Sequence, residues 1–181
     1  GERFTQSVLI DEEVLDGIRA CIDFAPLHNP HNLKGYSACK AVLPKCPHVA
    51  IFDTAFHQSM PPKAFLYGMP YSIYQKHGIR RYGFHGISHR YVSYRLGQLT
   101  GKHRDNLRII TCHLGNGCSM AALDHGKSVD TTMGFTPLEG LLMGTRTGDM
   151  DPSIILTVIA KEEITLNEAN NLMNKHSGLA G

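Results

Sequence analysis

The spacing of apolar positions predicts three helices in the first hundred residues. Between residues 11 and 22 apolar side chains recur at helical spacing, and three acidic residues at the start lie where the helix dipole favours negative charge. Two prolines and two asparagines mark 25–32 as a loop on the surface or at a site, after which 33–43 has a helical pattern again. Ser88 is expected to cap a further helix that runs to about Thr100.

Short apolar runs predict the strands. Residues 49–52 form a run typical of a buried strand, which ends abruptly at Asp53. Residues 107–113, 118–123 and 127–131 predict three more strands, separated by glycine-containing turns. Strands joined by such short turns form an antiparallel meander, and this is the arrangement we expect.

Two helices are predicted near the end of the sequence. Pro152 stands at a favoured first-turn position of a helix that runs through Ala160. Thr165 and Glu168 have the spacing of a capping box, which predicts a helix ending near His176. Both helix starts therefore carry a specific sequence signal.

Length and composition indicate an ordinary globular protein. The 181 residues allow one large domain or two small or incomplete ones. Hydrophobic residues make up 42% and charged residues 19%, which excludes intrinsic disorder. The longest apolar run, 154–160, is far shorter than the roughly 20 residues of a membrane span, so we expect no membrane association.

Charge and cysteine content narrow the function classes. The net charge of +2 is too small to favour nucleic acid or a membrane surface as a partner. The five cysteines are odd in number and include no C-x-x-C pair, which argues against a zinc ribbon or a disulfide framework. We therefore expect reduced thiols and a cytoplasmic location.

A glycine-rich turn follows the predicted strand 107–113. It consists of His113, Leu114, Gly115, Asn116 and Gly117, and glycines allow backbone N–H groups to approach and bind an anion. The alternative is a hairpin turn that needs glycine only for positive φ. From the local pattern alone the hairpin turn is the stronger interpretation, and His113 and Asn116 beside the glycines weaken it somewhat.

A second candidate is the loop 144–152, which places one arginine between hydroxyl side chains just before a helix. The guanidinium of Arg146 suits bidentate binding of a phosphate or a carboxylate. For Asp149 and Asp151 a structural role, including capping of the following helix, is as good an explanation as a role in chemistry.

His85 and His89 lie four residues apart, the spacing with which two histidines on one helix face bind zinc. H-E-x-x-H is absent, and Gly86 indicates that His85 precedes the helix, so a metal pair is the weaker interpretation. For His89 we favour a structural hydrogen bond at the helix start.

Asp53 follows a predicted strand, where its carboxylate could hold Mg²⁺ or polarise a nucleophile. Initiation of a turn explains the residue equally well. Neither a Walker A motif nor a G-x-S-x-G sequence occurs, which removes the main support for P-loop NTPases and α/β-hydrolases.

Taken together, these motifs resemble the acetate kinase family, which includes propionate kinases. The resemblance covers essentially the whole chain. It is carried by 25–30 (Ala-Pro-Leu-His-Asn-Pro), 50–57 (Ala-Ile-Phe-Asp-Thr-Ala-Phe-His), 81–86 (Arg-Tyr-Gly-Phe-His-Gly), 109–122 around the glycine-rich turn, and 144–152 (Gly-Thr-Arg-Thr-Gly-Asp-Met-Asp-Pro).

The resemblance implies reversible transfer of the ATP γ-phosphoryl group to acetate, giving ADP and acetyl phosphate, with Mg²⁺. Arg146 resembles the arginine that binds the carboxylate and stabilises the transferring group, and His85 the histidine that hydrogen-bonds it. Asp53 resembles the aspartate that positions Mg²⁺ and the reactants, indirectly where the metal is concerned. The phosphate or nucleotide loop corresponds to His113, Gly115, Asn116 and Gly117, and the acyl pocket to Leu27, His28, Phe84 and Pro137.

The implied fold is α/β, the RNase H-like fold of acetate and sugar kinases, heat-shock ATPases and actin, in incomplete form. Residues 1–52 would end the N-terminal domain and 53–181 would begin the second. The family's N-x-G-S-S-S-x-K loop, a second substrate-binding arginine, the adenosine loops and a C-terminal glutamate have no counterpart in this sequence. We therefore expect a central fragment that is inactive alone and is of poor stability unless it dimerises.

Three alternatives remain at this point. One is a propionate or other short-chain acyl kinase, since one methylene changes pocket affinity by only about 1–3 kcal/mol. Another is a catalytically inactive module that assembles with a partner or binds phosphate. The third is a histidine-based metalloprotein, which we rank last.

Overall fold

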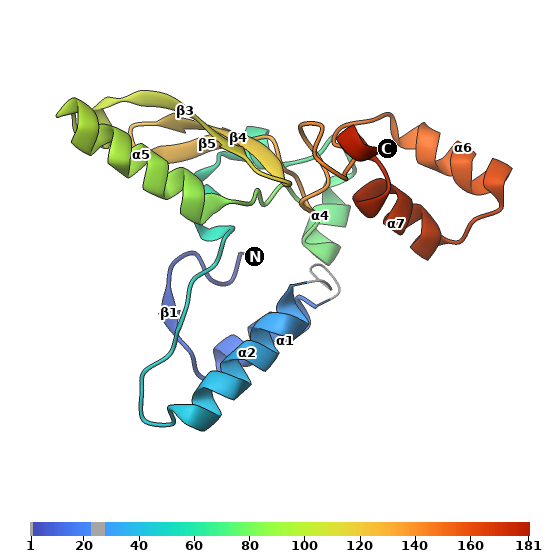
Figure 1. Ribbon diagram of the computed structural model, residues 1–181. Helices are drawn as coiled ribbons and strands as arrows, with labels where there is room; N and C mark the ends of the chain where they lie inside the picture. The colour runs from blue at the N-terminus through green and yellow to red at the C-terminus, as the bar shows by residue number, and fades with distance from the viewer. Residues whose placement is uncertain (1, 23–27) are drawn as a thin grey trace.

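A three-stranded antiparallel sheet is the centre of the larger part of the molecule. The computed structural model describes residues 2–22 and 28–181. Its strands β3 (Arg108–Leu114), β4 (Cys118–Asp124) and β5 (Lys127–Thr131) pair in that order (Figure 1). The predicted meander is confirmed, because each pair of neighbouring strands is joined by a short turn.

Helix α5 (Gly86–Thr100) packs on one face of this sheet (Figure 1). Along β3 and β4 side chains alternate between the two faces, so Thr111, Ser119 and Ala121 are buried. On the opposite face Ile110 and Leu114 are 73% and 74% exposed. The sheet is therefore covered on one side only within the described residues.

The predicted start of α5 was wrong. The helix begins at Gly86, and the preceding residue, His85, is in the left-handed conformation with φ 58° and makes no side-chain cap. Ser88 lies inside the helix, and its hydroxyl is hydrogen-bonded to Nδ1 of His113 at 2.9 Å. The carboxylate that binds the first-turn N–H groups comes from a residue distant in sequence, which is described with the site below.

A smaller unit is formed by the N-terminal residues. Strand β1 (Val8–Leu9) pairs with β2 (Val49–Ala50), and helices α1 (Glu12–Ala20) and α2 (Asn29–Val42) pack together (Figure 1). Asp11 caps α1 by accepting a hydrogen bond from the N–H of Val14 at 2.9 Å. This confirms the first predicted helix.

Two predictions for this unit were wrong. The run 49–52 is not a buried strand, because β2 contains only two residues and Ile51 is 63% exposed. The predicted loop 25–32 ends early, since α2 already begins at Asn29. Pro30 lies in its first turn, where the missing N–H costs no helical hydrogen bond.

Short helices connect the two units, and a helical pair ends the chain. The connecting helices are η1 (Ala55–Ser59), α3 (Pro62–Phe65) and α4 (Tyr71–His77), and η2 (Arg104–Asn106) precedes the sheet. The final pair is α6 (Pro152–Glu162) and α7 (Leu166–Lys175), followed by η3 (Gly178–Ala180). In the part of the chain that the structure describes, no helix combines the length and hydropathy needed to cross a membrane.

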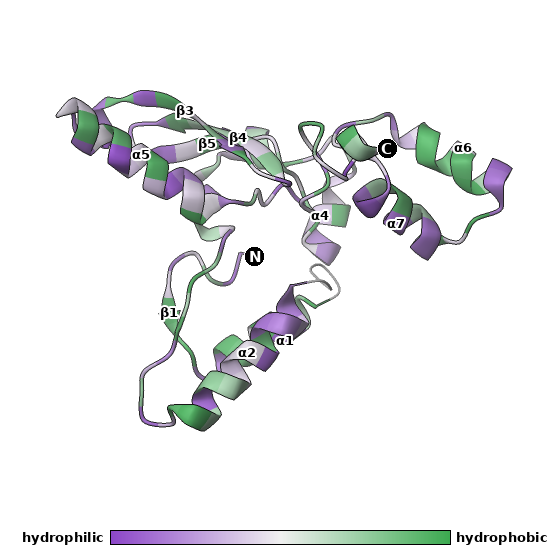
Figure 2. Ribbon diagram, viewed as in Figure 1, coloured by the Kyte–Doolittle hydropathy of each residue, from purple (hydrophilic) through white to green (hydrophobic). Residues whose placement is uncertain are grey.

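Both C-terminal helix starts agree with the sequence. Asp151 caps α6 by accepting from the N–H of Ser153 at 2.9 Å, and Thr165 and Glu168 form the predicted capping box of α7. Figure 2 shows that α6 is hydrophobic along much of its length, and Leu156 is 66% exposed.

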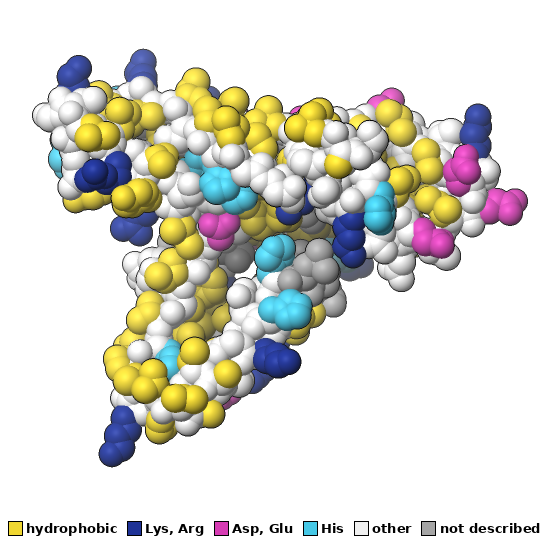
Figure 3. Space-filling view, in the orientation of Figure 1, with side chains coloured by type: hydrophobic (Ala, Val, Ile, Leu, Met, Phe, Trp, Pro, Cys, Tyr) yellow, Lys and Arg dark blue, Asp and Glu magenta, His cyan; other side chains and the backbone are white. Residues whose placement is uncertain are grey.

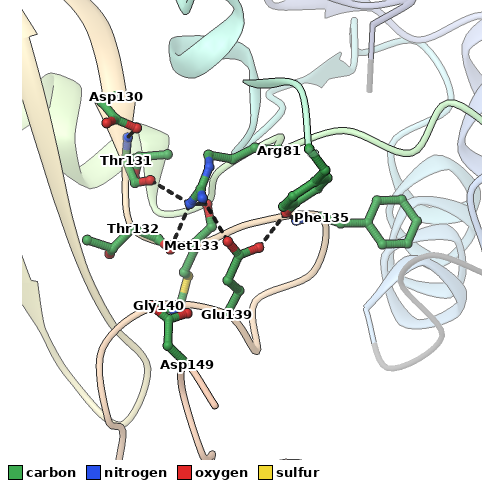
Figure 4. Close-up of polar contacts among 10 residues, drawn as sticks. Arg81, Asp130, Thr131, Thr132, Met133, Phe135, Glu139, Gly140 and Asp149 are labelled. Atoms are coloured by element: carbon green, nitrogen blue, oxygen red, sulfur yellow. Dashed lines mark hydrogen bonds and ion pairs between the residues drawn. The ribbon is translucent and has the colours of Figure 1, made fainter. Parts of the chain in front are cut away.

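A polar cluster fastens the long segment after β5 to the rest of the molecule (Figure 4). Arg81 donates to Oε1 of Glu139 at 2.7 Å and to the carbonyl oxygens of Thr131 and Thr132 at 2.9 and 3.1 Å. The hydroxyl of Tyr67 donates to the other oxygen of Glu139 and accepts from the N–H of Phe135 at 2.7 Å. This cluster fixes where the segment that carries Pro137 and Arg146 begins.

We expect Tyr67→Phe to destabilise the chain by about 1–3 kcal/mol, because it leaves the Phe135 N–H and one Glu139 oxygen without the hydroxyl they share. Tyr74→Phe is the matched control, since it removes an exposed hydroxyl that donates to Glu2. Urea unfolding of the chain measures both. Equal midpoints for the two variants would contradict the anchoring role of Tyr67.

Candidate functional site

Four segments that are distant in sequence meet at one place. They are the residues after β2, the start of α5, the β3–β4 turn and the loop 144–146. Figure 3 shows histidine, acidic and basic side chains gathered at the concave junction between the α1–α2 unit and the sheet-containing part. The structure thus brings together most of the residues that the sequence singled out.

Asp53 binds the start of α5. Its Oδ2 accepts from the N–H of His85 at 2.5 Å and its Oδ1 from the N–H of Ile87 at 3.4 Å, while its own carbonyl accepts from Gly86 at 3.0 Å. A carboxylate is well suited to this place, because a helix N-terminus has unpaired N–H donors and a partial positive charge. Asp53 does more than initiate a turn, because its carboxylate accepts a hydrogen bond from an N–H group 32 residues later in the sequence.

Gly86 is required for this contact. A Cβ at this position would lie 2.2 Å from the carbonyl oxygen of Asp53, a backbone atom that cannot move aside. The close approach of the two segments is therefore available only to glycine.

His85 is held by its backbone and by its ring. Its φ of 58° is unusual for a residue with a Cβ and is supported by the Asp53 hydrogen bond. The imidazole stacks on that of His113, with ring centroids 3.9 Å apart and planes inclined by 22°. Its Nδ1 is 2.8 Å from the hydroxyl oxygen of Ser119.

Gly117 is the point where His85 and Arg146 meet. A Cβ on Gly117 would lie 3.2 Å from Nε2 of His85 and 3.3 Å from Nη1 of Arg146. Both side chains therefore reach the same few ångströms of the β3–β4 turn, and a side chain here would compete with them for space. Neither Gly115 nor Gly117 has positive φ, so the alternative of a turn that merely needs glycine for its dihedral angles does not hold.

Arg146 is fixed by its own loop. Its Nη1 donates to the carbonyl of Pro137 at 3.0 Å and to the sulfur of Met143 at 3.7 Å, and the described residues leave the other N–H groups of the guanidinium for a ligand. The loop is tied to Asn116 as well, because the N–H of Gly144 donates to the carbonyl of Asn116 at 3.1 Å. Asp149 closes the loop by accepting from the N–H of Gly140 at 2.7 Å, so its role here is structural.

The site keeps the imidazole of His85 neutral and its arginine charged. Burial lowers the pKa of His85, and the neighbouring His113 and Arg146 lower it further, while Asp53 opposes the shift. Burial also lowers the pKa of Arg146, which leaves a guanidinium protonated at neutral pH. The arrangement combines one permanent positive charge with the uncharged, hydrogen-bonding ring of His85.

Sequence reasoning missed a buried polar network behind His85. His89 is fully buried, with Nδ1 at 2.8 Å from Oγ1 of Thr111 and Nε2 at 2.8 Å from Oγ of Ser119. The structural hydrogen bond expected of His89 is therefore confirmed, and it has two. The available signal was hydroxyl residues at alternate positions of the predicted strands, on the face that carries His113.

A buried histidine that the sequence analysis did not single out is His57 in η1. It is fully buried, with Nδ1 at 2.8 Å from the hydroxyl oxygen of Ser128 and Nε2 at 3.0 Å from the carbonyl of Phe84. Its ring lies 5.7 Å from that of His89. The backbone of Phe84, a predicted pocket residue, is thus anchored directly before His85.

The remaining predicted pocket residues are less well placed. Leu27 lies outside the described residues. His28 precedes α2, is exposed and makes no cap hydrogen bond, and it belongs to the α1–α2 unit (Figure 1). Pro137 lies beside Arg146 through its carbonyl. Of these residues, Phe84 and Pro137 adjoin the cluster.

The carboxylate of Asp53 is the candidate metal ligand at this cluster. The described residues contain no group of three or more His, Cys, Asp or Glu side chains placed to hold a metal ion. Mg²⁺ in phosphoryl-transfer sites is often bound by one or two carboxylates together with substrate phosphates and water, and Asp53 fits that donor pattern. His85 and His89 both contact Ser119, whose hydroxyl lies between them.

The geometry suits an anion that gains negative charge. A guanidinium, two imidazole rings and a glycine turn meet, and Ser119 is fully buried and so is not placed to act as a nucleophile. Phosphoryl transfer needs mainly positive charge, hydrogen-bond donors and alignment of the reactants.

Comparison with known proteins gives a consistent family. The model of the acetokinase family matches residues 1–181. Acetate kinases of Clostridioides difficile and Carboxydothermus hydrogenoformans are 57% and 56% identical to this chain over all of its residues. The chain spans about half the length of these curated relatives, 46% in both cases.

Solved structures agree. A crystal structure of Porphyromonas gingivalis acetate kinase has a TM-score of 0.92 and 49% identity, and the match covers 98% of this chain and 45% of that one. A propionate kinase from Francisella tularensis has a TM-score of 0.95 and 47% identity, covering 99% and 46%. These likenesses confirm the expected α/β, RNase H-like fold in incomplete form.

The fully buried His57 and His89 and the half-buried His85 predict acid sensitivity. Burial lowers the pKa values of His57 and His85, and that of His89 to about 4, below the ordinary value of 6.5. Between pH 6.5 and 4 the unfolded chain therefore binds more protons at His89 than the folded chain does, so stability decreases as pH falls, by up to about 1.4 kcal/mol per pH unit from this residue, and His57 and His85 act in the same direction.

Chemical denaturation of the chain between pH 7.5 and 4.5 measures this slope. His89→Gln should reduce it, whereas replacing the exposed His103 by Gln should not. Identical slopes in the two variants would contradict the assignment of the acid sensitivity to the buried cluster.

Proposed function

This chain belongs to the acetokinase family, and on that premise we propose that it supplies the phosphoryl-transfer centre of an acetate kinase. The proposed reaction moves the γ-phosphoryl group of ATP reversibly to acetate, giving ADP and acetyl phosphate. The observation that carries the proposal is the meeting of His85 and Arg146 at Gly117. Because the chain spans about half of its relatives, activity is proposed for the complete enzyme and not for this segment alone.

The proposed nucleophile needs no strong base. A carboxylate is already ionised at neutral pH, so the site must neutralise charge and align the two substrates. Among the described residues Arg146 binds Pro137 and Met143 through Nη1, and its remaining N–H groups are the donors we assign to the carboxylate and to the transferring group. The Nε2 edge of His85 faces the same point and is assigned a hydrogen bond to the transferring phosphoryl oxygen.

The β3–β4 turn is the proposed phosphate-binding loop. His113 stacks on His85, and the turn formed by Gly115, Asn116 and Gly117 lies against the Arg146 loop. Glycines at these positions allow a phosphate to approach the backbone closely.

Mg²⁺ is the proposed metal, and it would neutralise the phosphate charge when bound with ATP. Asp53 is the residue of this chain that we assign to its orientation, through water or directly. The same carboxylate holds the N–H of His85. Asp53 thereby sets the position of His85 in the site.

Acetate is the proposed substrate, and propionate is the second candidate. Phe84 and Pro137 adjoin the cluster and are assigned, with Leu27 and His28, to the pocket for the acyl methyl group. The likeness to a propionate kinase at TM-score 0.95 supports the second candidate. One methylene changes binding by only about 1–3 kcal/mol, so the family resemblance does not separate the two substrates.

We also propose a boundary between 1–52 and 53–181, with the site at the junction of the two parts. Figure 1 supports this division, since β1, β2, α1 and α2 lie apart from the β3–β5 sheet. A cytoplasmic location is proposed in keeping with five free cysteines. A homodimer is proposed because a second copy could bury exposed apolar residues such as Ile110, Leu114 and Leu156.

Activity can be tested in a chimaeric kinase in which these 181 residues replace the matched segment of the Clostridioides difficile relative. With ATP, Mg²⁺ and acetate, acetyl phosphate is trapped as the hydroxamate. Turnover by the chimaera supports the proposal, and a folded but inactive chimaera contradicts it and favours a non-catalytic module. Comparing acetate with propionate decides the substrate.

Arg146→Ala in this chimaera should lower kcat by about 10²–10³ or more, because it removes charge compensation in the transition state. Arg146→Lys should recover little, since an ammonium lacks the planar two-point geometry. Arg108→Ala is the matched control, because that arginine is exposed and bound only to Asp124. Near-normal turnover of Arg146→Ala would remove Arg146 from the mechanism.

A further inference from the structure

We propose that Ser119 is a positioning residue that sets which ring nitrogen of His85 carries the proton, through a hydrogen-bonded relay that runs from Thr111 through His89 and Ser119 to His85. The inference rests on the proposed function for its catalytic consequence. The relay itself rests on geometry alone.

The relay is continuous and buried. Thr111 Oγ1 is 2.8 Å from His89 Nδ1, His89 Nε2 is 2.8 Å from Ser119 Oγ, and Ser119 Oγ is 2.8 Å from His85 Nδ1. His89 and Ser119 are fully buried and Thr111 is 6% exposed. His89 and Ser119 are closed to bulk solvent, so their protons must be placed on partners within the relay.

One hydroxyl between two imidazoles makes the two tautomers interdependent. Ser119 has a single proton and can donate it to only one of the two rings, so the other ring must donate to Ser119. If Ser119 donates to His85 Nδ1, then neutral His85 carries its proton on Nε2. If Ser119 donates to His89, then His85 carries its proton on Nδ1 and Nε2 has only a lone pair.

Only the arrangement in which Ser119 donates to His85 Nδ1 provides a hydrogen-bond donor for a phosphoryl group. The oxygens of a transferring phosphoryl group accept hydrogen bonds, so Nε2 of a neutral His85 must be the donor. That edge faces Gly117 together with Nη1 of Arg146. The relay therefore decides whether His85 offers the site a donor or an acceptor.

Thr111 completes the relay because its hydroxyl can either donate a hydrogen bond to His89 Nδ1 or accept one from it. Its hydroxyl either donates to His89 Nδ1, which gives the arrangement with a donor at His85 Nε2, or donates to the carbonyl of Ala121 at 3.4 Å. The distance from Thr111 Oγ1 to His89 Nδ1, 2.8 Å, is shorter than the distance from Thr111 Oγ1 to the carbonyl oxygen of Ala121. The relay thus has two complete hydrogen-bonding patterns, and we infer that an anion at Nε2 selects the first.

The neighbouring pair, His57 and Ser128, provides an internal comparison. His57 Nε2 faces the carbonyl of Phe84, which can only accept, so His57 carries its proton on Nε2 and Ser128 donates to Nδ1. His57 has one permitted tautomer, whereas His89 faces two hydroxyls and has two. A buried histidine–serine hydrogen bond is therefore present both within the relay, between His89 and Ser119, and outside it, between His57 and Ser128.

Burial, and after it the charged and titratable groups around the relay, lower the pKa values of His85 and His89 and keep both rings neutral. Those around His85 are Asp53, His57, His113 and Arg146, and those around His89 are Asp53, His57, His85 and His113. Three of the four neighbours of each ring lower its pKa, and only Asp53 raises it. Neutral rings are the condition under which a tautomer, rather than a net charge, decides hydrogen-bonding character.

The first experiment reads the tautomers directly in the 181-residue chain. Nitrogen-15 NMR of histidine-labelled protein at pH 7.5, with and without saturating inorganic phosphate, distinguishes protonated from unprotonated ring nitrogens. We expect His85 to become Nε2-protonated with phosphate, and we expect His57 to be Nε2-protonated in both conditions. In Ser119→Ala the response of His85 should be lost, and in Ser128→Ala it should remain.

The second experiment measures turnover in the chimaeric kinase. Ser119→Ala should lower kcat by about tenfold or more, which is a smaller loss than the 10²–10³ expected when a donor is removed outright. The KM for acetate should change by less than about threefold. Ser128→Ala should change kcat by less than about twofold, because it removes a buried histidine–serine bond of the same kind outside the relay. Thr111→Val, which keeps shape and loses the hydroxyl, should lower kcat as well, and Thr111→Ser should restore it.

Two results would overturn the relay. One is an unchanged His85 tautomer response in Ser119→Ala, and the other is equal loss of kcat in Ser119→Ala and Ser128→Ala. If Ser119→Ala does not fold, Thr111→Val and Thr111→Ser give the same comparison at the far end of the relay. An inactive parent chimaera would overturn the proposed function instead, and the tautomer measurement would still decide the relay.

Discussion

The contact between Asp53 and the start of α5 is the constraint on which the site depends. The carboxylate accepts from the N–H of His85 at 2.5 Å, and the carbonyl of the same residue accepts from Gly86 at 3.0 Å. A charged acceptor of this kind contributes about 1.5–3 kcal/mol, enough to offset the roughly 1–3 kcal/mol of a left-handed residue. Without it, His85 has little reason to hold a φ of 58°, and its ring would not lie between His113 and Ser119.

Glycines are concentrated around the site because several segments approach one another closely there. Gly86 allows the Asp53 backbone to approach, Gly117 leaves space for His85 and Arg146, and Gly144 allows the Arg146 loop to reach Asn116. In each case the close neighbour is a functional group or backbone, and a Cβ would displace it. The site is thus formed by backbone segments that approach more closely than side chains permit.

The sequence predicts local structure well where one segment contains its own signal. The β3–β5 meander, the Asp151 cap and the Thr165–Glu168 capping box are each read from adjacent residues, and the structure confirms them. The start of α5 is missed because its cap is Asp53, 33 residues before the first helical residue. A cap supplied from a distant segment leaves no pattern at the helix itself.

The same limit applies to the site. Asp53, His85 and Arg146 are found from the sequence because resemblance to a family identifies them, whereas local pattern alone leaves each with a structural alternative. Ser119, Thr111 and Ser128 are not found, because a hydroxyl on a strand is ordinary until a buried histidine from another element faces it. Residues whose role depends on a partner distant in the sequence are therefore recognised only once the fold is known.

The balance of charge in this cluster suits the proposed reaction. Arg146 is its permanent cation, while burial and mutual repulsion keep His85 and His89 neutral. Further fixed cations would bind the anionic substrates tightly before reaction, and only interactions that strengthen in the transition state accelerate it. A neutral imidazole that donates a hydrogen bond gains strength as charge develops on the phosphoryl oxygens, without holding the ground state as firmly. The buried hydroxyls behind the ring are what would keep that donor correctly aimed.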